Sequence, residues 1–523
     1  MKFARFLNTK MTPQSEPIPG SGQVANSEGG YAWRLDPWQQ LDRFLILGTE
    51  GGTCYVDERK LTIQNATSVL ACIAEDGERV VRRVVEISDA GRAAKNDPAI
   101  FVLALCTTAE NESARQAAFA ALPRVCRTGT HLFQFASEVD ALRGWGRGLR
   151  SAIGRWYGGD DVNHLTYQAI KYRRRGGWSH RDLLRLAHPK PASDAHRVLY
   201  KWIVDDELVG ENVRIAAVEA LKRAEDVESV AALIREHDLP REAIPTEWLT
   251  RPEVWEALFE RMPVTAMLRN LGNLSKVGLL TPGSEATRRA IEALTNGERI
   301  RKARLHPIAV LIAGTQYGQG HGLLGSGKWK PVPRLVAALD AAFTIAFHNV
   351  EPTGKRFLLG VDVSGSMTCG LVAGTTLTPH VAATAMAMVT MRTEEAVTPM
   401  AFSHRFRKLR LTPNMSLEEA MKHTQDAAFG GTDCALPMSW ALKEKLPIDT
   451  FVVYTDNQTW FGDIHPAQAL AAYRDKMGID AKLAVVGMTA DEFTIADPSD
   501  QGMMDFVGFD AALPQALAEF ARM

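Results

Sequence analysis

The sequence predicts a two-part protein: an all-α body of helical repeats followed by a doubly wound α/β domain. Apolar residues recur at helical spacing over most of the first 350 residues, in segments of roughly 10–18 residues separated by Gly, Pro or Asn. Near residue 355 this pattern changes to short apolar runs that alternate with helical stretches. A length of 523 residues also calls for more than one hydrophobic core.

The boundaries follow from these changes of pattern. Residues 1–30 are rich in Pro, Gly and Ser, and we expect a flexible arm there. Residues 31–350 are predicted to be helical, without convincing β alternation. Many short helices in succession favour stacked helix pairs of the HEAT type over an irregular helical domain, although the sequence period is weak. The second domain is predicted to span residues 351–523.

This second domain is predicted to contain buried strands that alternate with helices. The apolar runs lie at 356–364, 398–403, 450–456 and 482–487, and the helical stretches between them at 380–393, 416–427 and 435–445. Such alternation indicates a mostly parallel sheet with helices on both faces.

Oxygen-bearing side chains follow two of these strands. The run GVDVSGSM places Asp362, Ser364 and Ser366 directly after the first strand. The run GGTD offers Thr432 in a Gly-rich loop, and VVYTDN places Asp456 after another strand. Ligand sites in such sheets lie outside the carboxyl ends of the strands. Carboxylate and hydroxyl oxygens suit a hard divalent cation, Mg²⁺ first and Mn²⁺ as the alternative.

The ordered set of these five residues resembles the metal-ion-dependent adhesion site of von Willebrand A domains. That resemblance implies a metal with an open position that accepts a carboxylate from a partner. The plainer alternative is that the same residues only cap helices and form turns. An enzymatic site would need more carboxylates, often a second metal and a general base. We therefore expect a binding protein without catalytic residues.

A strongly basic segment, AIKYRRRGGWSHRDLLRLAHPKP, spans residues 169–191. We expect one helix from Asp160 or Asp161 to about Arg175, ended by two glycines. Ser179 and Asp182 resemble a capping box that opens a second helix, which Pro189 ends. The residues predicted to contact nucleic acid are Lys171, Arg174, Arg175, His180, Arg181, Arg185, His188 and Lys190.

Helical spacing would place these cations in two rows. Lys171 and Arg175 are spaced i, i+4, so a continuous helix would put them on one face. Rows of cations neutralise phosphates and give salt-dependent affinity for nucleic acid. Trp178 could stack on a base, although burial in the core is the stronger expectation. The alternative is a solvated face with ion pairs, which the thirteen Lys/Arg against four Asp/Glu over 143–201 disfavour.

Net charge also differs between the helical part and the α/β part of the chain. The net charge of −1 conceals −7 from residue 351 onward and +6 before it, so the helical part is the one suited to a polyanion. A second basic run at 298–331 adds to the positive charge, but Trp329 follows Lys328, so the Walker pattern of nucleotide triphosphate sites is absent. Scattered cysteines and the lack of a signal-peptide or membrane-helix pattern lead us to expect a cytoplasmic protein.

Several segments together resemble the Ro autoantigen family, whose helical portion is called the TROVE module. They are KYRRRGGWSHRDLLRLAHPK (171–190), KARLHP (302–307), GHGLLGSGKWKP (320–331), ALDAAF (338–343) and VEPTGKRFLLGVDVSGSM (350–367). The resemblance implies a closed ring of HEAT-like repeats joined to a von Willebrand A domain. It implies binding of small noncoding Y RNAs outside the ring, through Lys171, Arg175 and His188, and of single-stranded 3′ ends of misfolded RNAs in the central hole.

The same resemblance implies a monomeric protein that acts in RNA quality control without DNA or membrane partners. An exoribonuclease tethered by a Y-like RNA is an additional partner that it makes plausible. The competing hypothesis is a metal-dependent protein-adhesion module on a helical scaffold, without any RNA function.

Overall fold

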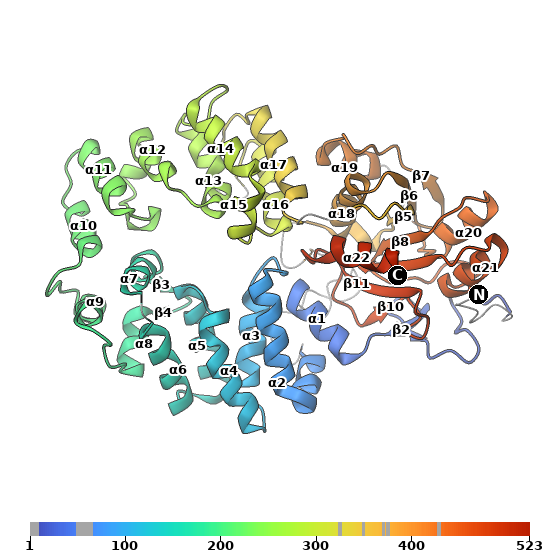
Figure 1. The fold of residues 1–523 in the computed structure, drawn as a ribbon, viewed down its shortest axis with the longest axis horizontal. Coiled ribbons are helices and arrows are strands. Elements are labelled where there is room, and N and C mark those ends of the chain that lie inside the picture. The colour runs from blue at the N-terminus through green and yellow to red at the C-terminus, as the bar shows by residue number, and fades with distance from the viewer. Residues whose placement is uncertain are drawn as a thin grey trace.

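The structure, a computed structural model, describes residues 10–48, 66–159, 161–322, 327–347, 351–368, 372, 377–425 and 430–523. The predicted two-part architecture is confirmed: a curved body of helices is followed by an α/β domain that lies between the two ends of the body (Figure 1).

The helical body consists of short helices that pack on their neighbours along the chain, such as α1 on α2 and α3 on α5. Their bounds are α1 (Pro37–Leu47), α2 (Thr67–Ala90), α3 (Asp97–Cys106), α4 (Glu112–Val125), α5 (Gly129–Arg143), α6 (Arg147–Tyr157), α7 (Val162–Lys171), α8 (His180–Ala187), α9 (Asp194–Asp205), α10 (Val213–Leu221), α11 (Val227–His237), α12 (Pro252–Glu260), α13 (Val264–Lys276), α14 (Glu285–Thr295), α15 (Gly297–Lys302), α16 (Pro307–Gln319) and α17 (Pro333–Ile345). α3 is buried from Pro98 to Cys106, as its apolar sequence requires.

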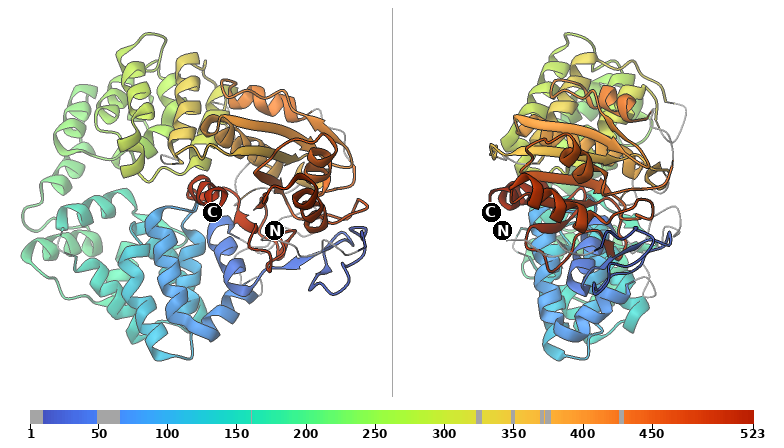
Figure 2. Two further views of the ribbon diagram at one scale, coloured as in Figure 1. Left: turned by 45° about the vertical axis from the view of Figure 1, so that its right-hand side comes forward. Right: turned by 90° about the vertical axis from the view of Figure 1, so that its right-hand side faces the viewer.

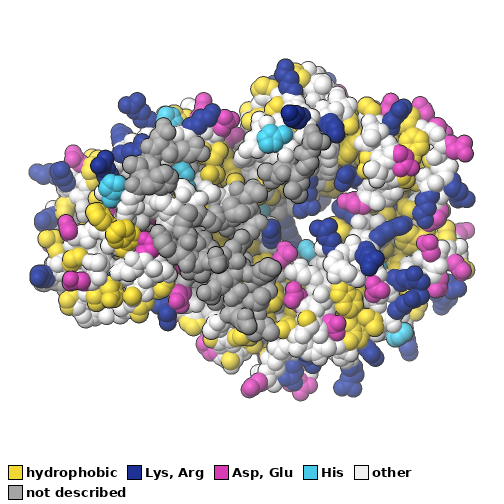
Figure 3. Space-filling view, turned by 180° about the vertical axis from the view of Figure 1, so that it is seen from behind, with side chains coloured by type: hydrophobic (Ala, Val, Ile, Leu, Met, Phe, Trp, Pro, Cys, Tyr) yellow, Lys and Arg dark blue, Asp and Glu magenta, His cyan; other side chains and the backbone are white. Residues whose placement is uncertain are grey.

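The body closes into a ring, because its two ends meet. Nε2 of His306, just before α16, lies 2.9 Å from the carbonyl oxygen of Arg92, just after α2. The α/β domain joins the same place: the N–H of Ala511 donates to the Arg92 carbonyl (3.3 Å), and Asp510 pairs with the Arg92 guanidinium. Figure 2 shows the closed outline, and Figure 3 shows an opening through the helical body with Lys and Arg side chains around it.

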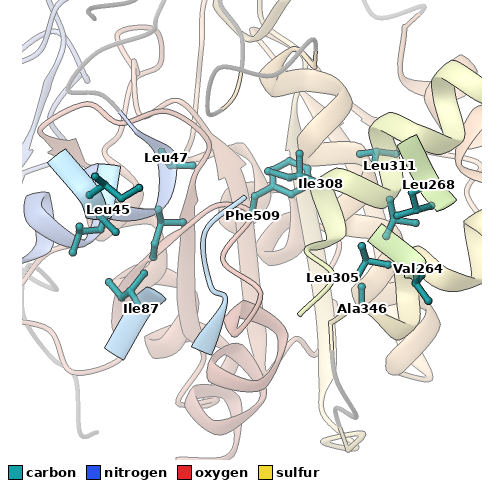
Figure 4. Close-up of a cluster of buried hydrophobic side chains, with 14 of the residues drawn as sticks. Leu45, Leu47, Ile87, Val264, Leu268, Leu305, Ile308, Leu311, Ala346 and Phe509 are labelled. Carbon is teal, nitrogen blue, oxygen red and sulfur yellow. The ribbon is translucent and has the colours of Figure 1, made fainter. Parts of the chain in front are cut away.

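A continuous hydrophobic cluster supports this closure. It includes Leu47 and Ile87 from the beginning of the body, Ile308 and Leu311 from its end, and Phe509 from the α/β domain (Figure 4). Burial of apolar side chains contributes about 25 cal/mol for each Å² removed from water, so a shared cluster holds the three parts together more firmly than polar contacts alone.

The α/β domain contains a six-stranded sheet in the order β11-β9-β8-β5-β6-β7, with β7 antiparallel and the other neighbours parallel. Its strands are β5 (Arg356–Asp362), β6 (Ala396–Phe402), β7 (Phe406–Lys408), β8 (Thr450–Thr455), β9 (Lys482–Gly487) and β11 (Met503–Val507). Its helices are α18 (Pro379–Thr393), α19 (Leu417–Gln425), α20 (Leu436–Lys443), α21 (Pro466–Met477) and α22 (Leu513–Arg522).

The two faces of the sheet lie in two different hydrophobic clusters. Successive side chains of a strand point to opposite faces, and Leu358 and Leu359 of β5 accordingly enter different clusters. Helices α20 and α21 cover the face of Leu358, whereas α18, α19 and α22 cover the face of Leu359. The predicted doubly wound sheet is therefore confirmed.

The prediction of a flexible N-terminal arm is wrong for the part of it that the structure describes, residues 10–30. This segment packs on the α/β domain, where Ile18 enters the hydrophobic cluster of that domain; Trp33, just after the segment, enters the same cluster. Strands β1 (Val24–Ala25), β2 (Tyr31–Arg34) and β10 (Phe493–Thr494) form a small antiparallel sheet. The strand that pairs with β2, which is β10, comes from the far end of the chain, and composition alone does not predict such a pairing.

No helix within the described ranges is both long and apolar enough to cross a membrane.

Candidate nucleic-acid interface and metal centre

The basic segment forms a helix, a tight β turn and a second helix. α7 ends at Lys171, and β3 (Arg174–Arg175) pairs with β4 (Trp178–Ser179). Gly176 and Gly177 between them have φ values of +56° and +84°, a conformation that glycine adopts without steric cost. The prediction of one helix reaching Arg175 is therefore wrong, and Lys171 and Arg175 are not neighbours on a helix face.

The second helix begins as predicted. The hydroxyl of Ser179 accepts from the N–H of Asp182 (3.2 Å), and the Asp182 carboxylate accepts from the N–H of Ser179 (2.9 Å). This capping box occupies the segment's single acidic side chain, while Leu183 and Leu184 are buried beneath the helix. Of the residues predicted to contact nucleic acid, those that are exposed are Arg174, Arg175, Arg181, Arg185, His188 and Lys190. We call these six residues the hairpin surface.

Lys171 lies at the edge of the hairpin surface and is half-buried. Its Nζ is 5.4 Å from the ring centroids of both Tyr167 and Tyr172. Burial acts to lower the pKa of Lys171, and the Tyr167 and Tyr172 oxygens act to raise it; the net shift is upward. The amine therefore stays charged, with its position fixed by the two rings.

His180 is not part of the hairpin surface, and its predicted role as an RNA contact is wrong. Only 3% of the residue is exposed, and its Nδ1 lies 2.6 Å from the hydroxyl of Tyr157. Burial lowers the pKa of His180 to about 4, so the ring is neutral at physiological pH. The residue holds the start of α8 against the core instead.

Trp178 is half-buried, so the expected burial is only partial. Its ring stacks on that of Trp145, with centroids 5.6 Å apart and an angle of 14° between the planes. Trp145 lies in the turn between α5 and α6, and its indole N–H donates to the carbonyl of Leu186 in α8 (3.2 Å). The aromatic pair thus fixes the hairpin to the preceding repeat.

The predicted metal ligands gather at the carboxyl edge of the sheet. Asp362 ends β5 and Asp456 follows β8, and these two strands are parallel neighbours. The N–H of Ser364 donates to Asp362 Oδ1 (2.9 Å), and the hydroxyls of Ser364 and Ser366 are 3.1 Å apart. The carbonyl of Thr432 accepts from the N–H of Phe461 (3.1 Å), which places the Gly-rich loop beside the loop that follows β8.

All five of these residues are at most 5% exposed, which has an electrostatic consequence. Burial, and then the charge of Asp456, raise the pKa of Asp362 to about 7. Burial also raises the pKa of Asp456, whose Oδ2 accepts no hydrogen bond within the described residues. Two buried carboxylates without a basic partner are unfavourable unless a proton or a cation compensates them, so this donor set fits a divalent ion.

The hydroxyl-rich character of the site limits its chemistry. Across the described ranges no group of three or more His, Cys, Asp and Glu side chains is arranged to hold a metal. Such clusters are typical of zinc sites and of two-metal catalytic centres, whereas two carboxylates with hydroxyls suit one hard cation.

A buried polar chain, which no local sequence pattern predicts, links the site to the helical body. The side chain of Gln458 donates to Asp491 (3.1 Å), while its N–H donates to Asp456 (3.2 Å). Asp491 accepts from Arg43 of α1 (2.7 Å), which also reaches Asp505 (2.7 Å). These contacts join residues about 450 positions apart, a pairing that local pattern cannot predict.

Similarly, Gln14 of the N-terminal segment supports the Gly-rich loop. It is fully buried and donates to Asp433 Oδ1 (2.6 Å) and to the carbonyl of Ile464 (2.8 Å).

Fold and sites together define a protein class: a closed ring of helical repeats joined to a von Willebrand A-type domain, with a basic hairpin and an acidic sheet edge. The TROVE domain model matches residues 24–317, and the Ro60 vWA domain model matches residues 356–521. The chain therefore belongs to the Ro60 family of TROVE proteins, in agreement with the resemblance of its sequence motifs.

Similar proteins cover nearly the whole chain. RNA-binding protein RO60 of Deinococcus radiodurans is 46% identical over 525 residues, which are 99% of this chain and 98% of the relative. RNA-binding protein RO60 of Caenorhabditis elegans is 35% identical over 593 residues, 98% of this chain and 92% of the relative. The crystal structure of Deinococcus radiodurans RO (RSR) protein has a TM-score of 0.71 at 46% identity, covering 93% of this chain and 99% of that chain.

Proposed function

We propose that this protein binds small noncoding Y-like RNAs and the single-stranded 3′ ends of misfolded structured RNAs. In this proposal it acts in cytoplasmic RNA quality control as a monomeric protein, together with an exoribonuclease that degrades the RNA. The relatives named above are RNA-binding proteins, which supports RNA as the ligand.

The observation that carries the proposal is the hairpin surface. It presents five exposed Lys and Arg side chains and one exposed histidine on one short segment, whose one carboxylate is occupied in the capping box of α8. Phosphates are the complementary ligand, because each neutralised phosphate releases counterions and adds favourable entropy. Lys171 adds a fixed charge at its edge.

The metal site has a different role in this proposal. A Mg²⁺ ion, or Mn²⁺ in its place, would be held by Asp362, Ser364, Ser366, Thr432 and Asp456. When bound, it supplies a positive centre for an acidic group of a partner. Nuclease chemistry usually needs further carboxylates and a base, so we propose that the protein does not cleave RNA by itself.

The test of the RNA proposal is the triple variant Lys171→Ala, Arg175→Ala, His188→Ser, titrated with a labelled Y-like stem-loop RNA over a range of salt concentrations. Loss of two or three phosphate contacts should weaken binding and reduce the salt slope by about 1.5–2.5 units. The matched control changes three exposed cations of the α/β domain, Arg405, Lys408 and Lys443, to Ala.

Equal affinity and slope in the hairpin variant and the wild type would contradict the proposal. The same RNA, recovered after incubation with Mg²⁺, should remain intact. Cleavage that disappears in Asp362→Ala would contradict the non-enzymatic role. If the purified protein binds no RNA at all, the alternative of a metal-dependent adhesion module on a helical scaffold gains support.

A further inference from the structure

One edge of the six-stranded sheet is open to a further strand. The two edge strands are β11 and β7. β11 lies against α1, and its Asp505 pairs with Arg43 of that helix (2.7 Å). β7 pairs only with β6 among the strands that the structure describes, and it lies on the outer side of the sheet (Figure 1). Such an edge offers backbone donors and acceptors to another chain.

The pairing of β6 with β7 shows which backbone groups are available. In an antiparallel pair, alternate residues direct their N–H and C=O groups toward the partner strand. The carbonyl of Arg405 accepts from the N–H of Ser403 in the β6 chain (3.0 Å), so the odd-numbered residues of this strand face β6. Phe406 and Lys408 therefore direct their N–H and C=O groups to the open edge.

The side chains along this edge are strongly basic. Arg405 and Arg407 lie on one face of the strand, because successive side chains alternate, and both are exposed. Within the described residues neither forms an ion pair, and their one side-chain hydrogen bond is from Arg407 to the carbonyl of His423 (3.4 Å). Lys408 and Arg410 are exposed as well. Since the domain as a whole is acidic, this edge is a local concentration of positive charge.

Apolar surface borders the same edge. Phe406, on the face opposite to Arg405, is half-buried, and its ring lies 5.4 Å from that of Trp440 in α20. At the start of β7, His404 contacts the ring of Phe461 edge to face (6.4 Å, 86°). Phe461 and its neighbour Trp460 are 45% and 41% exposed, and they are the two exposed aromatic side chains in the described part of the chain.

We propose that the open edge of β7 binds an extended acidic segment of a partner protein by strand addition. The backbone of the segment pairs with Phe406 and Lys408, and carboxylates at alternate positions face Arg405 and Arg407. Apolar residues between the carboxylates cover Phe406, and a further apolar side chain contacts Phe461. In this mode the main chain gives affinity and the alternate side chains give selectivity. The inference is independent of RNA binding and of the metal site.

Charge and hydrogen bonding select this occupant over two others. A second copy of β7 would place cations opposite cations, which is destabilising, so the basic edge disfavours self-association. A polynucleotide would neutralise the cations, but it has no regular row of donors for the outward C=O groups of β7. An acidic strand satisfies both the charges and the backbone groups.

The experiment measures the affinity of the full-length protein for the fluorescent peptide FEVEVEVEF, in EDTA and in Mg²⁺. The double variant Arg405→Glu, Arg407→Glu should weaken binding about tenfold, because cross-strand attractions become repulsions, and it should bind FKVKVKVKF instead. The matched control Lys408→Glu, Arg410→Glu makes the same change of charge on the opposite face. It should weaken binding at most about threefold, since only screened long-range attraction is lost.

Two further peptides separate strand addition and the aromatic contact from charge alone. FEPEPEPEF has the same charge but lacks alternate N–H donors, so it should not compete with FEVEVEVEF. Phe461→Ala should weaken binding of FEVEVEVEF several-fold and leave the affinity for AEVEVEVEA unchanged.

Several outcomes would overturn the inference. Equal affinity for FEVEVEVEF and FEPEPEPEF, or equal losses in the two charge-reversal variants, would reduce the edge to unspecific charge. Peptide binding that requires Mg²⁺ and disappears in Asp362→Asn would belong to the metal site. Competition by stem-loop RNA at its own Kd would assign the edge to RNA. The Arg405→Glu, Arg407→Glu variant should retain stem-loop RNA affinity, which shows that it is folded.

Discussion

The two buried carboxylates at the sheet edge predict an unusual dependence of stability on pH. The pKa of Asp362 is raised to about 7, so the folded state holds a proton that the unfolded chain has already released at that pH. The stabilisation that this proton gives the folded state is complete below about pH 4, the ordinary pKa of Asp, and is lost as pH rises through 7. A divalent cation replaces the proton. Because it binds the ionised carboxylates, the stabilisation that it provides increases as the pH rises.

We therefore expect the thermal midpoint of the metal-free protein in EDTA to fall between pH 5 and pH 8, and saturating Mg²⁺ to reduce that fall. Asp362→Asn should remove both the pH effect and Mg²⁺ binding in isothermal titration. Asp463→Asn, an exposed change in the loop after β8, is the control and should retain both. Full metal affinity in Asp362→Asn would show that the site is assigned incorrectly.

At the scale of the element, the turn between β3 and β4 decides where the cations of the hairpin lie. Gly176 and Gly177 both have positive φ, and neither has another atom within 4 Å of the position where a Cβ would stand. Substitution here therefore tests backbone conformation without a steric clash. Asn tolerates the left-handed region, whereas a β-branched residue does not.

Gly177→Val should accordingly weaken stem-loop RNA binding, because the strained turn displaces Arg174 and Arg175, while Gly176→Asn should bind as the wild type does. The strain is on the order of 1–2 kcal/mol and local, so the helical content measured by circular dichroism should be equal in both variants. Equal RNA affinity of the two variants would mean that the turn conformation does not matter for recognition.

At the scale of the whole molecule, Arg43 of α1 connects the helical body to the α/β domain. Its side chain is 1% exposed and lies between Asp491 and Asp505, which are 7% and 6% exposed. A charge placed so deeply is favourable only while its partners remain, because desolvation costs several kcal/mol for each ion. The contact therefore fixes how the two domains sit against each other.

Arg43→Met should decrease the free energy of unfolding by about 3–5 kcal/mol, since it leaves two carboxylates buried without a cation. Arg34→Met in the same region breaks the exposed pair with Glu492 and should cost at most about 1 kcal/mol. Urea unfolding of both variants gives the comparison, and similar midpoints would show that the buried pair contributes no more than a surface pair.

The sequence by itself determined both domain classes, the start of α8 and the placement of Asp362 and Asp456 at the ends of two buried strands. These features depend on hydrophobic period, on capping within four residues and on the rule that ligand sites follow parallel strands, and all of these are local. Binding of a metal ion at this edge of the sheet stays a prediction, because the order of the donor residues along the chain does not by itself show that an ion is bound.

Only the tertiary structure decided the remaining features. It buried His180 beneath the hairpin, ended α7 at Lys171, packed residues 10–30 on the α/β domain, and closed the ring through His306 and Arg92. Each of these depends on burial against residues far away in the chain. Whether a polar side chain faces water or the core depends on which distant element covers it, and the spacing of neighbouring residues carries no information about that.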